Sequence, residues 1–276
     1  MRLTSDRALF GLACGLALVL LFPFASRADA PVRIGGSGAA LATFQALVEA
    51  LRQADPSFNG KVVPSLGSSG SVKAVRAGAL EVAVPSRPLS AEEAQGLEWS
   101  EFARTPFVLA TGPANPQRLT LTQVADIYTG RHSTWPDGSP IRLILRPLGD
   151  SDTTVLGGLA PELKSAIPRL VAREGMIVAV TDQDAANQIE RLPGALGTST
   201  LALIQSESRS VRPVQLGGID PTTRALVDGT YPYYKSFYIV TKAVPSEPVM
   251  RFITFLRSAD GRRILERNGQ NAIAGR

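Results

Sequence analysis

Three segments of this chain repeat one local pattern, in which a short apolar run leads through a loop rich in Gly, Ser or Thr to a helical stretch. The loops lie at 36–39, 67–71 and 149–153. Strands that alternate with helices in this way form βαβ units, and such units build a mostly parallel sheet. In open α/β sheets the loops at the carboxyl ends of the strands bind ligands, so these three loops are the first candidates for a site.

Apolar runs and turn residues predict the remaining elements. The expected strands lie at 32–34, 61–66, 79–84, 107–111, 141–146, 177–180 and 237–241. Expected helices lie after the three loops and at 122–128, 182–191, 249–256 and 262–267, with Thr122 and either Thr181 or Asp182 as caps. The cluster of Gly and Pro at 112–116 is a candidate hinge, because these residues interrupt both helix and strand.

Composition bounds the size of the fold and the kind of partner. The chain has 276 residues, of which 44% are hydrophobic, enough for one large domain or two modest ones. Its net charge of +5 comes from Lys and Arg that are scattered singly, with no run longer than the Arg262-Arg263 pair. Nucleic acid is therefore not expected as a partner, because nucleic-acid binding uses clustered basic residues. The excess positive charge is compatible with a small anionic ligand.

The first thirty residues have the pattern of a secretory signal peptide. Arg2 and Arg7 precede an apolar run at 8–25, and the small residues of Ala28-Asp29-Ala30 suit signal peptidase. We expect cleavage after Ala30; the alternative is that the run stays as a membrane anchor, since it is just long enough to span. The single cysteine, Cys14, lies in this leader, so the mature chain has no disulfide and no thiol chemistry.

The three loops have the chemistry of an anion site. A helix start offers unpaired N–H groups and a partial positive charge, Gly lets an anion approach the backbone, and Ser or Thr hydroxyls add donors. The alternative for any one loop is that its hydroxyl merely caps the helix. Arg146, which stands just before the third loop, favours the anion site.

No catalytic or metal centre is predicted. His132 is the only histidine and lies in a polar loop, and the chain has no Gly-x-Ser-x-Gly elbow and no Walker lysine. One His with no Cys beyond the leader does not suit zinc. We therefore expect no cofactor and no metal, and a secreted phosphatase is the enzyme alternative that stays open.

Several segments resemble the periplasmic phosphate-binding proteins of ABC transporters. They are GSSGSVK at 67–73, VAVPSRPL at 82–89, LTQVADIYTG at 121–130 followed by Trp135, the Leu-Pro-Gly-Ala turn at 192–195, and Tyr231-Pro232 before a return strand at 237–240. They follow the order of the family along nearly all of the chain beyond the leader.

The resemblance implies a type II periplasmic-binding-protein fold, an α/β architecture of two lobes with mixed, mostly parallel sheets and two hinge crossovers. The expected lobes are 31–112 plus 237–276, and 113–236. The implied function is capture of phosphate or a similar oxyanion in the cleft between the lobes, by a periplasmic monomer that delivers the anion to an ABC permease in the inner membrane. An oxyanion-binding module that serves signalling or adhesion without transport is the alternative.

The resemblance and the loop chemistry together predict the ligand-binding residues. They are Ser37, Gly38, Ala39, Ser68, Ser69, Gly70, Ser86, Arg87, Arg146, Ser151, Asp152 and Thr153. Ser86 stands where some family members have a carboxylate that accepts a proton from phosphate. Because an ionised carboxylate only accepts hydrogen bonds, we expect Asp152 to take that role and to favour phosphate over sulfate, with a turn residue facing solvent as the alternative.

Overall fold

The computed structural model describes residues 30–113 and 118–273, and most of its strands join one sheet. The strands of that sheet are β1 (Val32–Gly36), β2 (Gly60–Val62), β3 (Val82–Val84), β4 (Leu97–Thr111), β6 (Arg142–Leu145), β7 (Ile177–Val178), β8 (Ala195–Thr200), β9 (Arg212–Pro213), β11 (Tyr234–Lys242) and β12 (Asn271–Ala272). A separate pair consists of β5 (Arg118–Leu119) and β10 (Gln215–Leu216).

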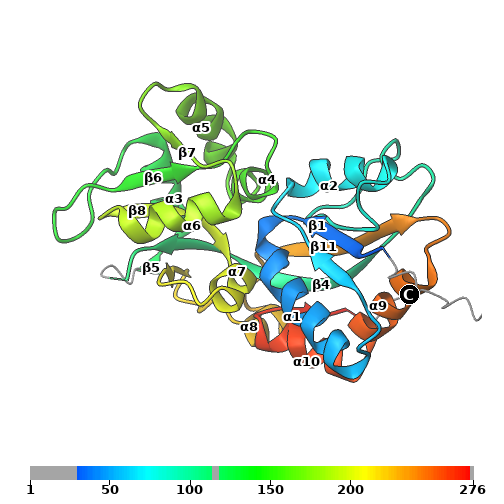
Figure 1. The fold of residues 1–276 in the computed structure, drawn as a ribbon. Helices are drawn as coiled ribbons and strands as arrows, with labels where there is room; N and C mark the ends of the chain where they lie inside the picture. Colours follow the sequence, from blue (N-terminus) through cyan, green and yellow to red (C-terminus); the bar gives the residue numbers. More distant parts are fainter. Residues whose placement is uncertain (1–29, 114–117, 274–276) are drawn as a thin grey trace, which may run out of the picture. The chain divides into compact units, whose positions relative to one another are not determined.

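The helices surround this sheet (Figure 1). They are α1 (Gly38–Ala54), α2 (Gly67–Arg76), α3 (Leu121–Thr129), α4 (Ser151–Gly157), α5 (Pro161–Ala172), α6 (Asp182–Arg191), α7 (Leu201–Ser206), α8 (Thr223–Val227), α9 (Glu247–Arg257) and α10 (Ala259–Arg267). Within the described ranges, none of them combines the length and the hydropathy that a bilayer-spanning helix needs.

The order of strands along the sheet is β2-β1-β3-β11-β4-β8-β6-β7, with β9 and β12 also paired to β4. The strands β1, β2 and β3 are mutually parallel, and so are β6, β7 and β8. Only β11 and β4 run antiparallel to the neighbours on this path. The predicted α/β fold with a mostly parallel sheet is therefore confirmed, with one parallel group in each of two lobes.

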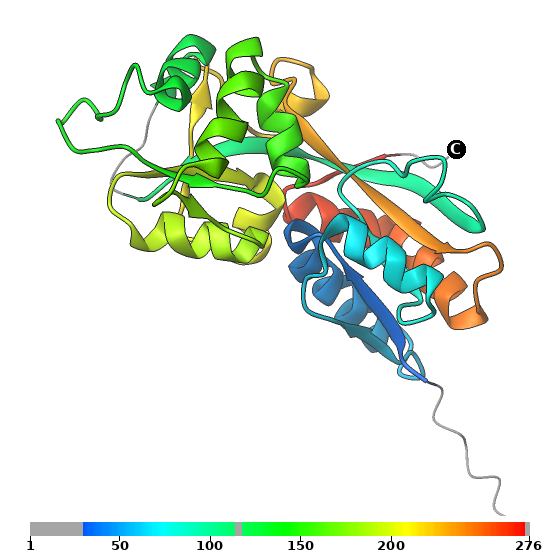
Figure 2. The same cartoon turned by 90° about the horizontal axis from the view of Figure 1, so that it is seen from above.

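The two lobes share strand β4. Its residues 97–106 pair with β11 in the first lobe, and its residues 107–111 pair with β8 in the second. Figure 2 shows β4 and β11 side by side as they pass from one lobe to the other. The expected strand at 107–111 is thus the end of a much longer one. The beginning of β4 carries polar and charged residues such as Glu98 and Glu101, so it has no apolar run by which to predict it.

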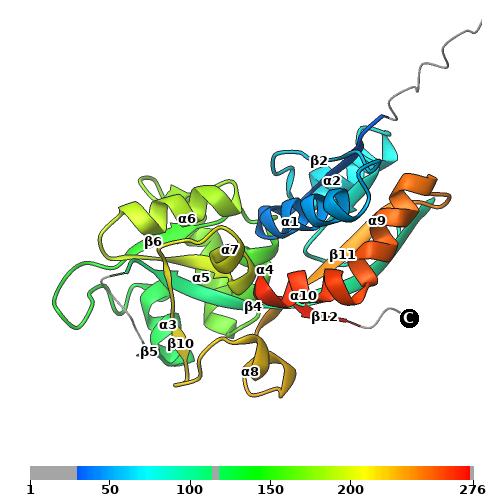
Figure 3. The same ribbon diagram turned by 60° about the horizontal axis from the view of Figure 1, so that its bottom comes forward.

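The core of the first lobe forms because α1 is amphipathic. Its apolar residues recur at helical spacing, and each is buried: Leu41, Phe44, Leu47, Val48 and Leu51. Burial of each such side chain contributes about 1.5–3 kcal/mol. Phe44 packs on Phe102 of β4 and Phe252 of α9, at centroid distances of 5.6 and 5.7 Å. Figure 3 shows α1, α9 and α10 grouped on this side of the sheet.

The second lobe has its own core, but its helices α6 and α7 also pack on the first lobe. Tyr128 of α3, Leu163 of α5 and Leu196 of β8 belong to the second core. Ala202 and Leu203 of α7 are instead buried in the first core, where α7 lies against α1. The lobes are therefore joined by apolar packing as well as by the two crossover strands.

Several helices begin earlier than the sequence predicts, among them α1, α4, α9 and α10. The segment predicted as the loop 67–71 is the first turn and a half of α2, which begins at Gly67. The cap of α3 is Thr120 and not Thr122, because Thr120 and Gln123 form a reciprocal capping box. The predicted cap Thr181 of α6 is confirmed, with Asp184 as its capping-box partner. The predicted leader, apart from Ala30, and most of the candidate hinge lie outside the described residues.

Gly36, at the end of β1, lies very close to the backbone of β3. A Cβ atom on Gly36 would lie 2.3 Å from the carbonyl oxygen of Val84 on β3. We expect Gly36→Ala to lower the free energy of unfolding by about 1–3 kcal/mol, because the paired backbones must separate. Urea unfolding measures this. Gly157→Ala is the matched control, since its Cβ meets no atom closer than 3.8 Å. Equal stability of the two variants would contradict the expected clash.

Candidate functional site

Ser37 links the end of β1 to the start of α1. It is the N-cap of α1, yet its side chain makes no capping hydrogen bond. Its backbone N–H donates to the carbonyl of Val84, 2.9 Å away, at the end of β3. The hydroxyl points instead toward the second lobe, where it donates to Asp182 Oδ2 at 3.3 Å. The capping alternative therefore does not hold for this loop, and the hydroxyl is directed into the site.

A chain of three hydroxyls lies beside this loop. Ser68 Oγ in α2 accepts from the backbone N–H of Ser86 at 3.0 Å and lies 3.1 Å from Ser86 Oγ. Ser86 Oγ lies 2.9 Å from Ser151 Oγ at the start of α4. Since Ser68 and Ser86 belong to the first lobe and Ser151 to the second, Ser86 connects the predicted segments 67–71 and 149–153 across the lobes.

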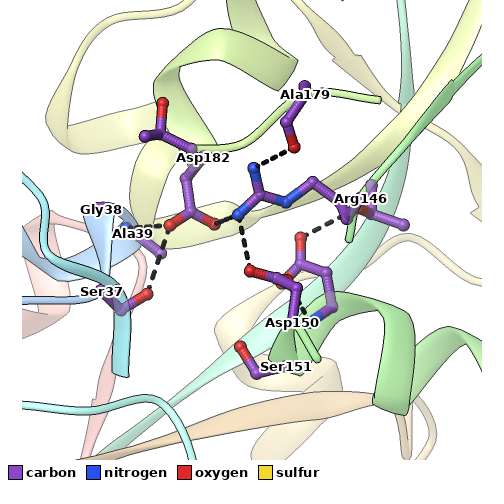
Figure 4. A network of polar contacts seen from close by, with 12 residues as sticks. Ser37, Gly38, Ala39, Arg146, Asp150, Ser151, Ala179 and Asp182 are labelled. Carbon is purple, nitrogen blue, oxygen red and sulfur yellow. Dashed lines mark hydrogen bonds and ion pairs between the residues drawn. The ribbon is translucent and has the colours of Figure 1, made fainter. Parts of the chain in front are cut away.

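Arg146 is buried at the end of β6, with 4% of its surface exposed. Its guanidinium donates to the carbonyl of Ala179 at 2.9 Å and to Asp150 Oδ2 at 2.8 Å, and one amino group lies 3.7 Å from Asp182 Oδ1 (Figure 4). Its Nε is buried and has no hydrogen-bond partner. The hydroxyl of Thr153 donates to the carbonyl of Arg146, which ties the arginine to the first turn of α4.

Asp152 is bound by Lys235 and Thr198, two partners that the sequence did not predict. One carboxylate oxygen pairs with Nζ of Lys235 on β11, and the other accepts from Thr198 Oγ at 2.9 Å. Asp152 and Lys235 are 1% and 2% exposed. Both oxygens therefore have a partner within the protein. The solvent-facing alternative does not fit this geometry, whereas the role of Asp152 as acceptor of a phosphate proton stays a prediction.

Asp182 meets the first anion loop from the opposite lobe. Its Oδ2 accepts from the backbone N–H of Ala39 at 3.2 Å as well as from Ser37. Gln183 beside it donates to the carbonyl of Gly38 at 3.0 Å. A Cβ atom on Gly38 would lie 2.3 Å from Gln183 Oε1 and 2.8 Å from Asp182 Oδ2, so any other residue there would require both side chains to move.

The buried charges set one another's protonation. Burial lowers the pKa of Arg146 and of Lys235, but the nearby carboxylates outweigh it and hold both pKa values above the ordinary ones. Burial alone would raise the pKa of Asp152, but the charges of Lys235 and Arg146 leave it lowered. Burial, together with the charge of Asp152, raises the pKa of Asp150. The site thus keeps two cations fully charged in the interior.

Not all the predicted ligand-binding residues gather around Arg146. Arg87 forms a two-pronged salt bridge with Glu93 and donates to Ser69 Oγ at 2.8 Å, and this group is partly exposed. Gly70 lies inside α2. The structure brings Ser37, Gly38, Ala39, Ser86, Arg146, Ser151, Asp152 and Thr153 together, with Ser68 behind Ser86.

Two residues of the cluster were not predicted as part of a site. Asp182 was noticed as a possible helix cap, but Thr181 caps α6 and leaves the Asp182 carboxylate free to reach the first lobe. Lys235 follows Tyr233 and Tyr234 in the sequence, where no local pattern distinguishes it as part of a site. His132 is exposed in the loop after α3. Within the described ranges, no three His, Cys, Asp or Glu side chains gather as metal ligands.

Known proteins resemble this chain in sequence and in fold. A family profile described as PBP superfamily domain matches residues 25–260. The phosphate-binding protein PstS 2 of Streptococcus agalactiae is 32% identical over 82 residues, which is 29% of this chain and only 27% of that relative's length.

Two crystal structures share the fold. One, from Clostridium perfringens, is described as a phosphate ABC transporter substrate-binding protein with bound phosphate; it has a TM-score of 0.75 and 25% identity, and the match covers 89% of this chain and 100% of that one. An ABC-type phosphate transport receptor from Vibrio cholerae has a TM-score of 0.61 and 22% identity, with 87% and 99% covered.

The pair of Lys235 and Asp152 is expected to dominate the stability of the site. Lys235→Met leaves a buried carboxylate without its cation, which costs about 3–5 kcal/mol of unfolding free energy. Adding Asp152→Asn restores the net charge of the cluster and should recover most of that loss. Chemical unfolding of the single and double variants measures both effects. Lys242→Met on the same strand is the control, because Lys242 is exposed. A double variant no more stable than Lys235→Met would show that the pair is not the cause.

Proposed function

Because the chain belongs to the PBP superfamily, we propose that it is an exported solute-binding protein that captures phosphate or a similar oxyanion between its lobes for uptake by an ABC transporter. The phosphate-binding relatives and the matched crystal structure with bound phosphate support this assignment. They also support a binding protein rather than an enzyme, so a secreted phosphatase is not proposed.

The observation that carries the proposal is the environment of Arg146. A buried guanidinium with an unpartnered Nε lies beside Asp150 and Asp182 at the starts of α4 and α6. Asp182 also contacts Ser37 at the start of α1, in the other lobe. Arginine binds oxyanions through charge-assisted, often bidentate hydrogen bonds. Backbone N–H groups at helix starts complement the same charge. The donors of both lobes then close on one anion.

The proposed contacts come from groups that already point toward one another. Arg146 supplies the charge, Ser37 and the N–H of Ala39 supply the first lobe's donors, and Ser86 and Ser151 supply hydroxyls at the boundary. Phosphate is the leading anion because of the relatives. The two lobes would close on the anion by rotating about the crossover strands β4 and β11, as in other two-lobed binding proteins.

The finer parts of the proposal concern location and partner. The chain is proposed to act in the periplasm as a monomer after removal of its leader. Its lobes were expected at 31–112 plus 237–276 and at 113–236, and the strand pairing favours a boundary within β4, after residue 106. The anion is then delivered to a permease in the inner membrane.

Arg146 is the residue whose loss should abolish binding. We expect Arg146→Ala to weaken phosphate affinity by about 30-fold to several-thousand-fold, since losing one partner of a buried charge pair costs about 2–5 kcal/mol. Calorimetric titration with inorganic phosphate measures the change, and Arg146→Lys separates charge from geometry. Arg131→Ala removes the same charge from a side chain that is 57% exposed and should bind like wild type. Unchanged affinity in the folded Arg146→Ala protein would place the ligand elsewhere.

Export is tested by the mass of the processed protein. We expect the protein recovered from the cell envelope to begin at Pro31, because Ala28 and Ala30 present small residues at the spacing that signal peptidase requires. Intact mass spectrometry of the envelope fraction gives the answer directly. A protein that keeps residues 1–30 would instead be anchored by them.

A further inference from the structure

We propose that Asp182 is an internal ligand of the anion site, which phosphate must displace in order to bind, and that this carboxylate thereby sets the affinity of the protein. The proposal rests on the proposed function and deepens it, because it concerns the same site. It also identifies a residue that neither the predicted loops nor the family resemblance pointed to.

The Asp182 carboxylate occupies donors that an oxyanion would use. Its Oδ2 accepts from Ser37 Oγ at 3.3 Å and from the backbone N–H of Ala39 at 3.2 Å, and its Oδ1 lies 3.7 Å from the guanidinium of Arg146. Figure 4 shows this carboxylate between the first loop and Arg146. An N–H group and a hydroxyl each have one proton to donate, so these donors cannot serve Asp182 and a phosphate oxygen together.

The charge of the cluster argues in the same direction. Two cations, Arg146 and Lys235, lie among three carboxylates, Asp150, Asp152 and Asp182. When all are ionised, the cluster carries one net negative charge and would repel an arriving anion. When the Asp182 carboxylate moves away from these donors, two cations and two carboxylates remain. The negative charge that repels phosphate is then gone.

Asp182 is the carboxylate that is free to leave. Asp152 is held by Lys235 and Thr198, and Asp150 caps α4 through the N–H of Asp152 while it pairs with Arg146 at 2.8 Å. The contacts of Asp182 are all longer than that, and α6 is capped by Thr181 and Asp184 without its help. Its side chain can therefore move away without cost to the helix.

The test is calorimetric titration of wild type and Asp182→Asn with inorganic phosphate and with sulfate. Asp182→Asn keeps the shape of the side chain but removes its charge. We expect it to bind phosphate about tenfold more tightly or better, since a hydrogen bond to a charged group is stronger than one to a neutral group and the competitor is weakened. Sulfate should gain by a similar factor, so the ratio of the two affinities stays within about threefold of wild type.

Asp184→Asn is the matched control, because it removes the charge of an exposed side chain in the same turn of α6 and keeps an oxygen that can accept from the N–H of Thr181. This variant should bind both anions within about twofold of wild type. If it instead gained as much affinity as Asp182→Asn, the gain would come from the net charge of the protein, and the proposal would be overturned. Asp182→Ala, which also removes the carboxylate, takes the place of Asp182→Asn if the latter does not fold.

Two further results would overturn the proposal and leave the proposed function standing. One is unchanged phosphate affinity in Asp182→Asn. The other is weaker phosphate binding with tighter sulfate binding, which would identify Asp182 as the acceptor of the phosphate proton. If wild type and both Asp182 variants bind neither anion, the proposed function itself fails, and the internal-ligand proposal fails with it.

Discussion

The burial of one guanidinium organises this structure. Arg146 stands at the end of a central strand with almost none of its surface in contact with water, and a buried charge without partners would cost several kcal/mol. The carbonyl of Ala179 and the carboxylates of Asp150 and Asp182 compensate this charge. The carbonyl follows the neighbouring strand, and the two carboxylates stand at helix starts. These partners fix where α4 and α6 begin relative to the sheet. The Nε of the same guanidinium has no partner within the protein, so one donor of Arg146 remains available.

The charges around Arg146 also connect the lobes. Asp182 reaches from α6 to the start of α1, and Lys235 reaches from the crossover strand β11 to Asp152 on α4. Each is a polar contact between segments that a rotation about the crossover strands would move. Apolar packing of α7 on α1 lies in the same region. Ligand binding in a protein built in this way must exchange one set of polar contacts for another, so the strength of the internal contacts helps to determine affinity.

Helix starts provide the predicted donors Ser37 and Ala39, but similar hydroxyl groups at other helix starts have different partners. Ser37 leaves its own helix uncapped and points across to the second lobe, while Thr120, Thr181 and Asp150 cap theirs. The hydroxyl of Ser68 serves the site indirectly, by holding Ser86. Similar residues in similar loops therefore have different roles. A hydroxyl can cap a helix or contact another group with the same chemistry, and only its tertiary surroundings decide which of the two it does.

The sequence by itself determined the α/β architecture, the position of Arg146 at a strand end and the loops that reach the site, because periodicity and turn chemistry act over a few residues. It could not predict β8, whose Gly, Thr and Ser residues have no apolar run although the strand is fully buried. It also could not predict that Lys235 takes the carboxylate of Asp152, 83 residues away, or that Asp182 meets Ser37, 145 residues away. Only the tertiary structure decided these partners, because a buried charged group pairs with the complementary polar group that the fold brings near it. No local sequence pattern specifies which group that is.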